Sequence, residues 1–64
     1  MKYRIEFRYI SSYDYFTPVM YIPVESTIVE ATSQDDAVRA LRDQFEYVNF
    51  ENVRILKIEE MVLR

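Results

Sequence analysis

The first nine residues of the chain alternate between apolar and charged side chains with a period of two. Large apolar side chains hold the odd positions of this pattern: Tyr3, Ile5, Phe7 and Tyr9. Successive side chains of a strand point to opposite faces of a sheet, so the pattern predicts a half-buried strand over residues 2–10. Its apolar side is bulky, which favours a central strand lying beneath a helix.

Residues 11–18 are rich in the turn-forming residues Ser, Asp and Pro and are expected to form a loop. A second extended segment follows this loop. β-branched residues are frequent from position 19 onward, but Pro23 has no N–H to give to a neighbouring strand. We therefore predict an edge strand whose regular part covers residues 24–31. Its alternation sends Thr27, Val29 and Ala31 toward the core, and Ile28 and Glu30 outward.

A helix with a readable start comes next. Ser33 is a good N-cap, and Asp36 stands three residues later, where a capping box usually has Glu. At 100° per residue, one stripe of the helix collects the residues expected to face the sheet: Ala37, Val38, Leu41, Gln44, Phe45 and Val48. The helix is predicted over residues 34–47.

The last segment, residues 53–63, is rich in Ile, Leu and Val but fits no single alternation. Either a bulge shifts its register or both of its faces are covered. The expected fold is α+β, a single domain over residues 1–64 with the order β-β-α-β. Its sheet is expected to have three mainly antiparallel strands in the order 2-1-3, with one helix packed on one face.

Composition excludes several classes of function. The 64 residues contain no Cys, no His and no Gly. Disulfides, thiolate metal sites, the commonest general base and phosphate-cradling glycine loops are therefore all absent. We expect a non-enzymatic protein with no catalytic, cofactor or metal site and no small-molecule substrate. No stretch of the chain is apolar enough for a membrane span, and a cytoplasmic location is the default expectation.

The first candidate site is an aromatic segment next to the first strand. Its residues combine large contact area with few rotatable bonds, and such residues are enriched in binding surfaces. The candidate partner-binding residues are Tyr13, Asp14, Tyr15, Phe16 and Tyr21. Two interpretations remain open: the rings fold back to cap the open end of the small core or take part in self-association, or they contact a different molecule.

The second candidate site is the polar side of the first strand, which the third strand extends if the two are neighbours. A nucleic-acid patch there would consist of Lys2, Arg4, Arg8, Arg54 and Lys57. The net charge of −3 gives no long-range attraction to nucleic acid, and the aromatic residues of the first strand alternate onto the opposite face. A solvated outer face is the simpler interpretation of these charges.

The stretch IVEATSQDDAVRALR at 28–42, followed by ILKIEEM at 55–61, resembles the β-α-β units of small archaeal ribosomal proteins of the LX type and of many short bacterial and phage proteins. The likeness assigns no role to any residue. We expect a small protein-interaction module, a homodimer, acting through its aromatic loop and an exposed sheet edge. A phage-type modulator or inhibitor of a partner protein would suit this size. The alternative is a nucleic-acid-associated module of ribosomal type.

Overall fold

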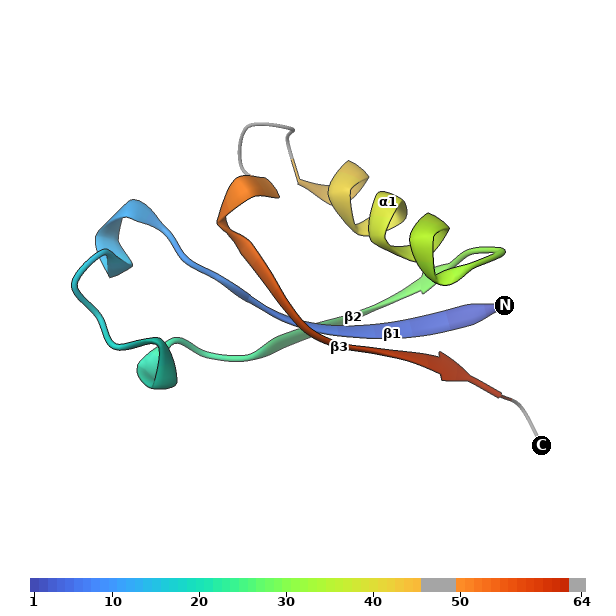
Figure 1. Cartoon of the computed structure of the whole chain (residues 1–64), viewed down its shortest axis with the longest axis horizontal. Coiled ribbons are helices and arrows are strands. Elements are labelled where there is room, and N and C mark those ends of the chain that lie inside the picture. The colour runs from blue at the N-terminus through green and yellow to red at the C-terminus, as the bar shows by residue number, and fades with distance from the viewer. Residues whose placement is uncertain (46–49, 63–64) are drawn as a thin grey trace.

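A computed structural model gives the arrangement of the chain and describes residues 1–45 and 50–62 (Figure 1). Its main elements are β1 (Lys2–Tyr9), β2 (Glu25–Glu30), α1 (Gln34–Gln44) and β3 (Val53–Met61). The three strands form one sheet in the order β2-β1-β3, and β1 is antiparallel to both neighbours. The predicted α+β fold with strand order 2-1-3 is confirmed.

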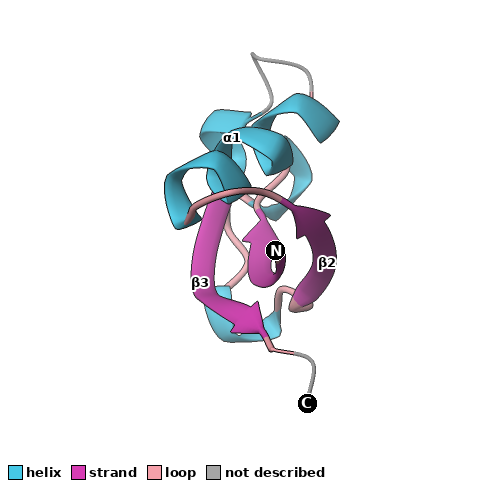
Figure 2. Cartoon of the chain, turned by 90° about the vertical axis from the view of Figure 1, so that its right-hand side faces the viewer, coloured by secondary structure: helices cyan, strands magenta, loops and turns pink. Residues whose placement is uncertain are grey.

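The core lies between β1 and α1. Tyr3, Ile5 and Phe7 of β1 are buried, and α1 lies over one face of the sheet (Figure 2). Ala37 and Leu41 of α1 are fully buried against them. Each large apolar side chain enclosed in this way contributes roughly 1.5–3 kcal/mol to the hydrophobic stabilisation. The alternation of the first nine residues thus sets which face of the sheet receives the helix.

The helix begins as predicted and ends earlier than predicted. The Asp36 backbone N–H donates to the Ser33 hydroxyl at 3.2 Å, which caps the first turn. Phe45 leaves the helix with φ −106° and ψ 148°, so the prediction that the helix extends through residue 47 is wrong at Phe45. Residues 46–48, including Val48 of the expected stripe, lie outside the described residues.

Phe45 leaves the helix because its ring is held by aromatic residues of the sheet. The ring meets Phe7 edge to face at 5.7 Å and stacks on Tyr9 at 5.6 Å between ring centroids. Aromatic pairs in these geometries contribute about 0.5–1.5 kcal/mol beyond their buried area. This tertiary contact outweighs the small preference of one further residue for the helix.

The irregular pattern of the last strand is explained by a bulge. Glu6 pairs with Lys57 and Phe7 pairs with Ile55, so Leu56 is an extra residue in β3. Before the bulge Val53 and Ile55 lie on the side of the helix, and after it Ile58 does. Of the two explanations that the sequence left open, the structure shows the register shift. β3 ends at Met61, and residue 63 of the predicted strand lies outside the described residues.

The connection between β1 and β2 is long, and it is built without glycine. Tight two-residue hairpin turns require positive φ, and no described residue of this chain has a positive φ. The chain instead turns through two short 3-10 helices, Ser12–Asp14 and Val19–Tyr21. The expectation of a simple loop followed by extended chain from residue 19 is therefore wrong at Val19–Tyr21. We call residues 10–24 the arm; it projects beyond α1 at one end of the molecule, which measures 42 × 24 × 12 Å (Figure 1).

Candidate functional site

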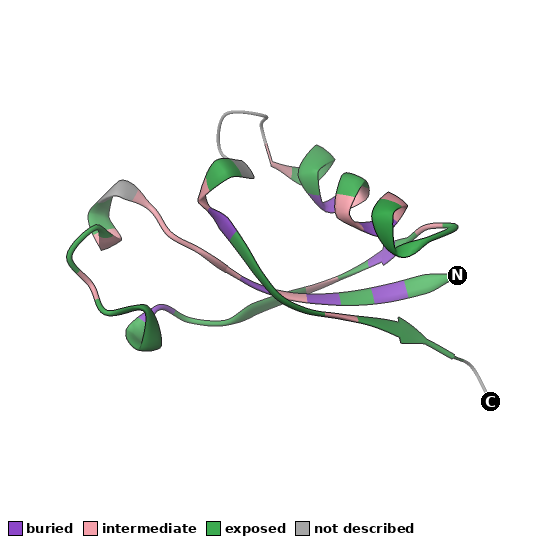
Figure 3. Ribbon diagram, in the orientation of Figure 1, coloured by how far each residue is buried: buried purple, intermediate pink, exposed green. Residues whose placement is uncertain are grey.

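The arm carries large apolar side chains that are almost entirely exposed. The exposed fraction is 96% for Tyr13, 80% for Tyr15, 92% for Phe16, 76% for Met20 and 72% for Tyr21. We call these five residues the aromatic tip. The interpretation in which the rings fold back over the core is wrong, because each of the four rings belongs to a residue that is at least 72% exposed. Most of the ribbon of the arm is coloured as exposed in Figure 3. At the Tyr9 end of β1, Phe45 stacks on Tyr9 and covers the core.

The first turn of the arm is closed by a serine–aspartate contact. The Asp14 carboxylate accepts hydrogen bonds from the Ser11 hydroxyl at 2.8 Å and from the Ser11 N–H at 3.2 Å. The Asp14 carbonyl accepts from the Thr17 N–H at 2.9 Å. Asp14 was predicted as a partner-binding residue; its carboxylate holds the turn that presents Tyr13 and Tyr15.

The second half of the arm is tied to β1 through one side chain. Arg8 donates from Nε to the Ile22 carbonyl at 3.1 Å, in a partly buried position. Ile22 is itself buried, unlike every other residue of the arm whose burial the structure describes. The hydrogen bond from Arg8 and the burial of Ile22 hold the segment that leads into β2. The neighbouring Met20 and Tyr21 are exposed to solvent.

The aromatic tip has the size and chemistry of a contact surface. Tyr15 and Phe16 meet edge to face at 5.0 Å between ring centroids, so two of its rings support each other. Its four rings expose roughly 700 Å², close to the ~800 Å² that each partner of a standard protein–protein interface buries. No charged residue occurs from position 15 to position 24. A surface of this kind binds through apolar area and tyrosine hydroxyls rather than through charge.

The predicted basic patch lies on the outer face of the sheet, opposite α1. The register places Arg4 beside Glu59, Glu6 beside Lys57 and Arg8 beside Arg54. All five predicted residues, Lys2, Arg4, Arg8, Arg54 and Lys57, therefore belong to one face. The prediction that the third strand neighbours the first and extends this row is confirmed.

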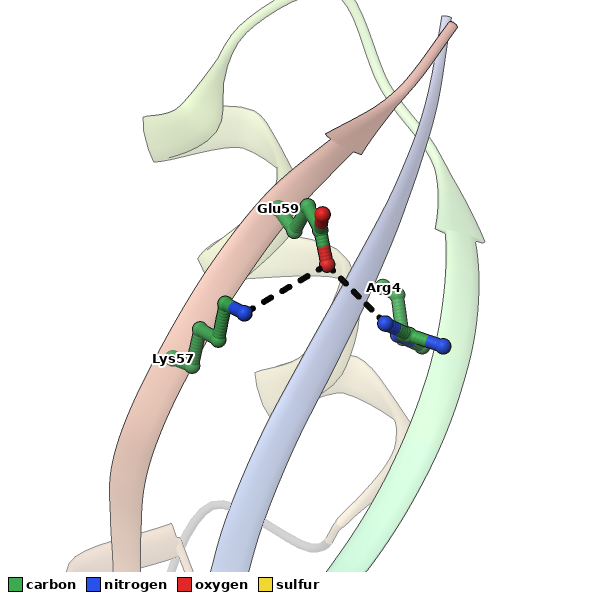
Figure 4. A network of polar contacts seen from close by, with 3 residues as sticks. All are labelled: Arg4, Lys57 and Glu59. Carbon is green, nitrogen blue, oxygen red and sulfur yellow. Dashed lines mark hydrogen bonds and ion pairs between the residues drawn. The ribbon is translucent and has the colours of Figure 1, made fainter. Parts of the chain in front are cut away.

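Carboxylates lie among these basic side chains and neutralise part of them. Glu59 accepts a hydrogen bond from Arg4 at 2.9 Å, and its carboxylate lies 3.7 Å from the Lys57 Nζ (Figure 4). The hydrogen bond from Arg4, and then the nearby charge of Lys57, hold the pKa of Glu59 below its ordinary value of 4.5. Glu30 stands opposite Lys2 on the other side of β1.

The two arginines at the other end of this face donate to backbone carbonyls. Arg8 bonds Ile22, and Arg54 bonds the Glu51 carbonyl at 2.6 Å and the Val53 carbonyl at 3.3 Å. Their guanidinium groups are partly used in holding the chain. The outer face is thus a mixed network of charges rather than a continuous positive surface.

Sequence reasoning missed Met20 and the structural role of Arg8. Met20 belongs to the uncharged run at 15–24, and the length of that run was the signal available to find it. Arg8 was assigned to the basic patch because alternation places it on the polar face. Its bond to Ile22 depends on how the arm returns to the sheet, which no local pattern encodes.

Within residues 1–45 and 50–62, no group of three or more acidic side chains lies close enough together to hold a metal ion. None of the helices in the same part of the chain is long and apolar enough to cross a membrane. No protein-family model matches the chain, and no curated protein or solved structure is significantly similar to it.

Proposed function

We propose that this protein is a small non-enzymatic interaction module that binds a protein partner through the aromatic tip of its arm and that also self-associates. The observation that carries the proposal is the exposure of the tip: each of its five large apolar side chains is at least 72% exposed. Connections of this length without a strand or long helix of their own are uncommon in compact domains, and binding loops are one of the usual reasons for them.

The energetics of such a surface favour binding to protein. Tyrosine and other aromatic residues supply much of the affinity at protein interfaces, and truncating a central one costs about 2 kcal/mol or more. The arm contains two short 3-10 helices and no strand, so few backbone hydrogen bonds support it. A partner that covers the aromatic tip removes apolar surface from water and supports the arm at the same time.

Nucleic-acid binding is less well supported by the same structure. Glu59 is shared between Arg4 and Lys57, and Arg8 and Arg54 donate to backbone carbonyls. The aromatic residues that would stack on bases, Tyr3 and Phe7, are buried under α1. Among the residues whose burial the structure describes, the exposed rings lie on the arm, and residues 10–24 include no Lys or Arg.

Affinity capture with matched variants tests the proposal. The wild-type protein, the double variant Tyr15→Ser/Phe16→Ser and the control Arg4→Ala/Lys57→Ala are each used as bait in extract from the source cells, at about 0.1 M and about 0.5 M salt. We expect a protein retained in stoichiometric amount by wild type and control at both salt concentrations, and lost with the arm variant.

One result of this experiment would contradict binding to a protein partner. If the control variant loses the bound material, the arm variant retains it, and binding falls steeply with salt, then the ligand is a nucleic acid held by the outer face. Circular dichroism of all three proteins shows whether each variant keeps its secondary structure.

A modulator or inhibitor of the partner is the role that we propose for a module of this size, because the chain offers an exposed apolar surface and contains neither Cys nor His. A cytoplasmic location is part of the same proposal. The chain contains no Cys, so its fold does not depend on an oxidising compartment.

A further inference from the structure

The open edge of β2 presents backbone groups that bond no other residue in the described part of the chain. The Ala31 N–H donates to the Met1 carbonyl at 2.8 Å, and the antiparallel pairing continues from there in unbroken register. Hydrogen-bonded and non-hydrogen-bonded pairs alternate in such a ladder, so Val29, Thr27 and Glu25 direct their backbone groups to β1. The N–H and carbonyl groups of Ser26, Ile28 and Glu30 therefore point away from β1, toward the open edge of the sheet.

The two edges of the sheet differ in how well they are protected. β2 and β3 form the lateral edges, with β1 between them and α1 above (Figure 2). The β3 edge is interrupted by the bulge at Leu56, and four of its nine residues are charged. The middle of β2, Ser26–Val29, has no bulge and no charge, and Ile28 is 54% exposed on the outer face. Bulges and charges are common devices against edge pairing, and the middle of β2 has neither.

The sequence of β2 is complementary to itself in one antiparallel register. With Ile28 of one copy opposite Ile28 of a second, Ser26 of each copy stands opposite Glu30 of the other. The Ile28–Ile28 pair and the two Ser26–Glu30 pairs all use the outward-pointing backbone groups. With two hydrogen bonds in each pair, they form about six interchain hydrogen bonds. The serine hydroxyl then donates to the glutamate carboxylate, the two isoleucines form an apolar pair on the two-fold axis, and no like charges face each other.

From this complementarity we propose that a second copy of the chain pairs with the β2 edge, with Ile28 on the two-fold axis, to form a continuous six-stranded sheet. The inference rests on the proposed function, in which self-association has a part, and adds the surface that performs it. Because the two β2 strands run in opposite directions, the arms leave opposite ends of the joint sheet. The dimer is therefore a bivalent module with two separate aromatic tips.

Charge reversal at the axis tests the register directly. Ile28→Lys and Ile28→Glu each place two like charges opposite one another in a dimer of that variant, but opposite charges in a mixed dimer. Analytical ultracentrifugation is expected to show a dimer for wild type, a dimer dissociation constant raised more than about tenfold for each variant alone, and a restored dimer when the two variants are mixed. Only a residue on the two-fold axis gives this pattern.

Ile28→Pro and Thr27→Pro form a second matched pair. The N–H of Ile28 faces the open edge, so Ile28→Pro is expected to keep the circular dichroism spectrum and to abolish the dimer. The N–H of Thr27 is used by β1, so Thr27→Pro is expected to damage the fold itself.

A wild-type protein that stays monomeric at high micromolar concentration overturns the inference. Dimerisation of Ile28→Lys as tight as that of wild type, or failure of the mixed variants to associate, does the same. Failure of the proposed function looks different, because the arm variant Tyr15→Ser/Phe16→Ser is then indistinguishable from wild type in partner capture, whatever its oligomeric state.

Discussion

The Nε of Arg8 lies 3.1 Å from the backbone carbonyl of Ile22 and donates a hydrogen bond to it. The bond joins the end of β1 to the returning half of the arm, next to the buried Ile22 side chain. The position of the aromatic tip relative to the sheet depends on this contact.

Replacing Arg8 is therefore expected to loosen the arm. A hydrogen bond from a charged donor contributes about 1.5–3 kcal/mol, so Arg8→Met should lower the free energy of unfolding by about 1–2 kcal/mol, since the freed carbonyl regains some water. Urea unfolding measures the loss, and amide hydrogen exchange should quicken in residues 18–22. Arg4→Met is the matched control, because Arg4 binds only the exposed Glu59 among the described residues. Equal effects of the two substitutions on stability and exchange would show that Arg8 does not hold the arm.

The core predicts a strong contrast between two leucines. Leu41 is fully buried and Leu56 is 47% exposed. Leu41→Ala is expected to cost about 2–5 kcal/mol, a large part of the ~3–10 kcal/mol typical of a domain of this length. Leu56→Ala is expected to cost about 0.5 kcal/mol or less. Thermal and urea unfolding compare them, and similar losses for both would contradict the described core.

Glu59 makes the stability depend on pH in a defined direction. Its pKa is below 4.5 in the folded protein, so the unfolded chain binds the proton more tightly. Ionised Glu59 therefore stabilises the fold above pH 4.5, and this contribution is lost as the pH falls through the lowered pKa. Glu59→Gln should be less stable than wild type at pH 7, and the difference should disappear in acid and shrink in about 1 M salt. A difference that persists in acid would assign the effect to packing.

The helix cap gives a fourth prediction. Ser33 accepts a hydrogen bond from the Asp36 N–H, so Ser33→Ala should lower the free energy of unfolding by about 1 kcal/mol. Ser33→Asp should keep most of the stabilisation from the cap, because an aspartate side chain also accepts this bond. Chemical unfolding of the three proteins measures this. Equal stability of Ser33→Ala and wild type would mean that the cap contributes nothing.

Local patterns were sufficient to predict the sheet and the start of the helix. The alternation of Tyr3, Ile5 and Phe7 depends only on the geometry of a strand with one buried face, and Ser33 caps through a bond three residues away. Pro23 indicated an edge strand for the same local reason. The order of the strands followed from an expected hairpin of the first two strands, from a right-handed crossover through the helix, and from the bulky apolar face of β1.

The features that sequence did not predict depend on distant contacts or on missing residue types. Phe45 leaves the helix because Phe7 and Tyr9 hold its ring, and the Arg8–Ile22 bond forms only after the arm has returned. The 3-10 helices of the arm replace tight turns that a chain without glycine does not make. Composition identified the aromatic segment, but composition does not show whether its side chains are exposed. Their exposure follows from the position of the arm beyond α1.

Photo-crosslinking from the arm is the most direct test of the proposed binding surface. A benzoylphenylalanine placed at Phe16, which is 92% exposed, samples what touches the aromatic tip inside the source cells, and the same group at Arg39 on the solvent side of α1 is the control. We predict a discrete adduct with a different protein from position 16 that is absent from position 39. Adducts with nucleic acid, or identical patterns from the two positions, would contradict the assignment of the tip as a protein-binding surface.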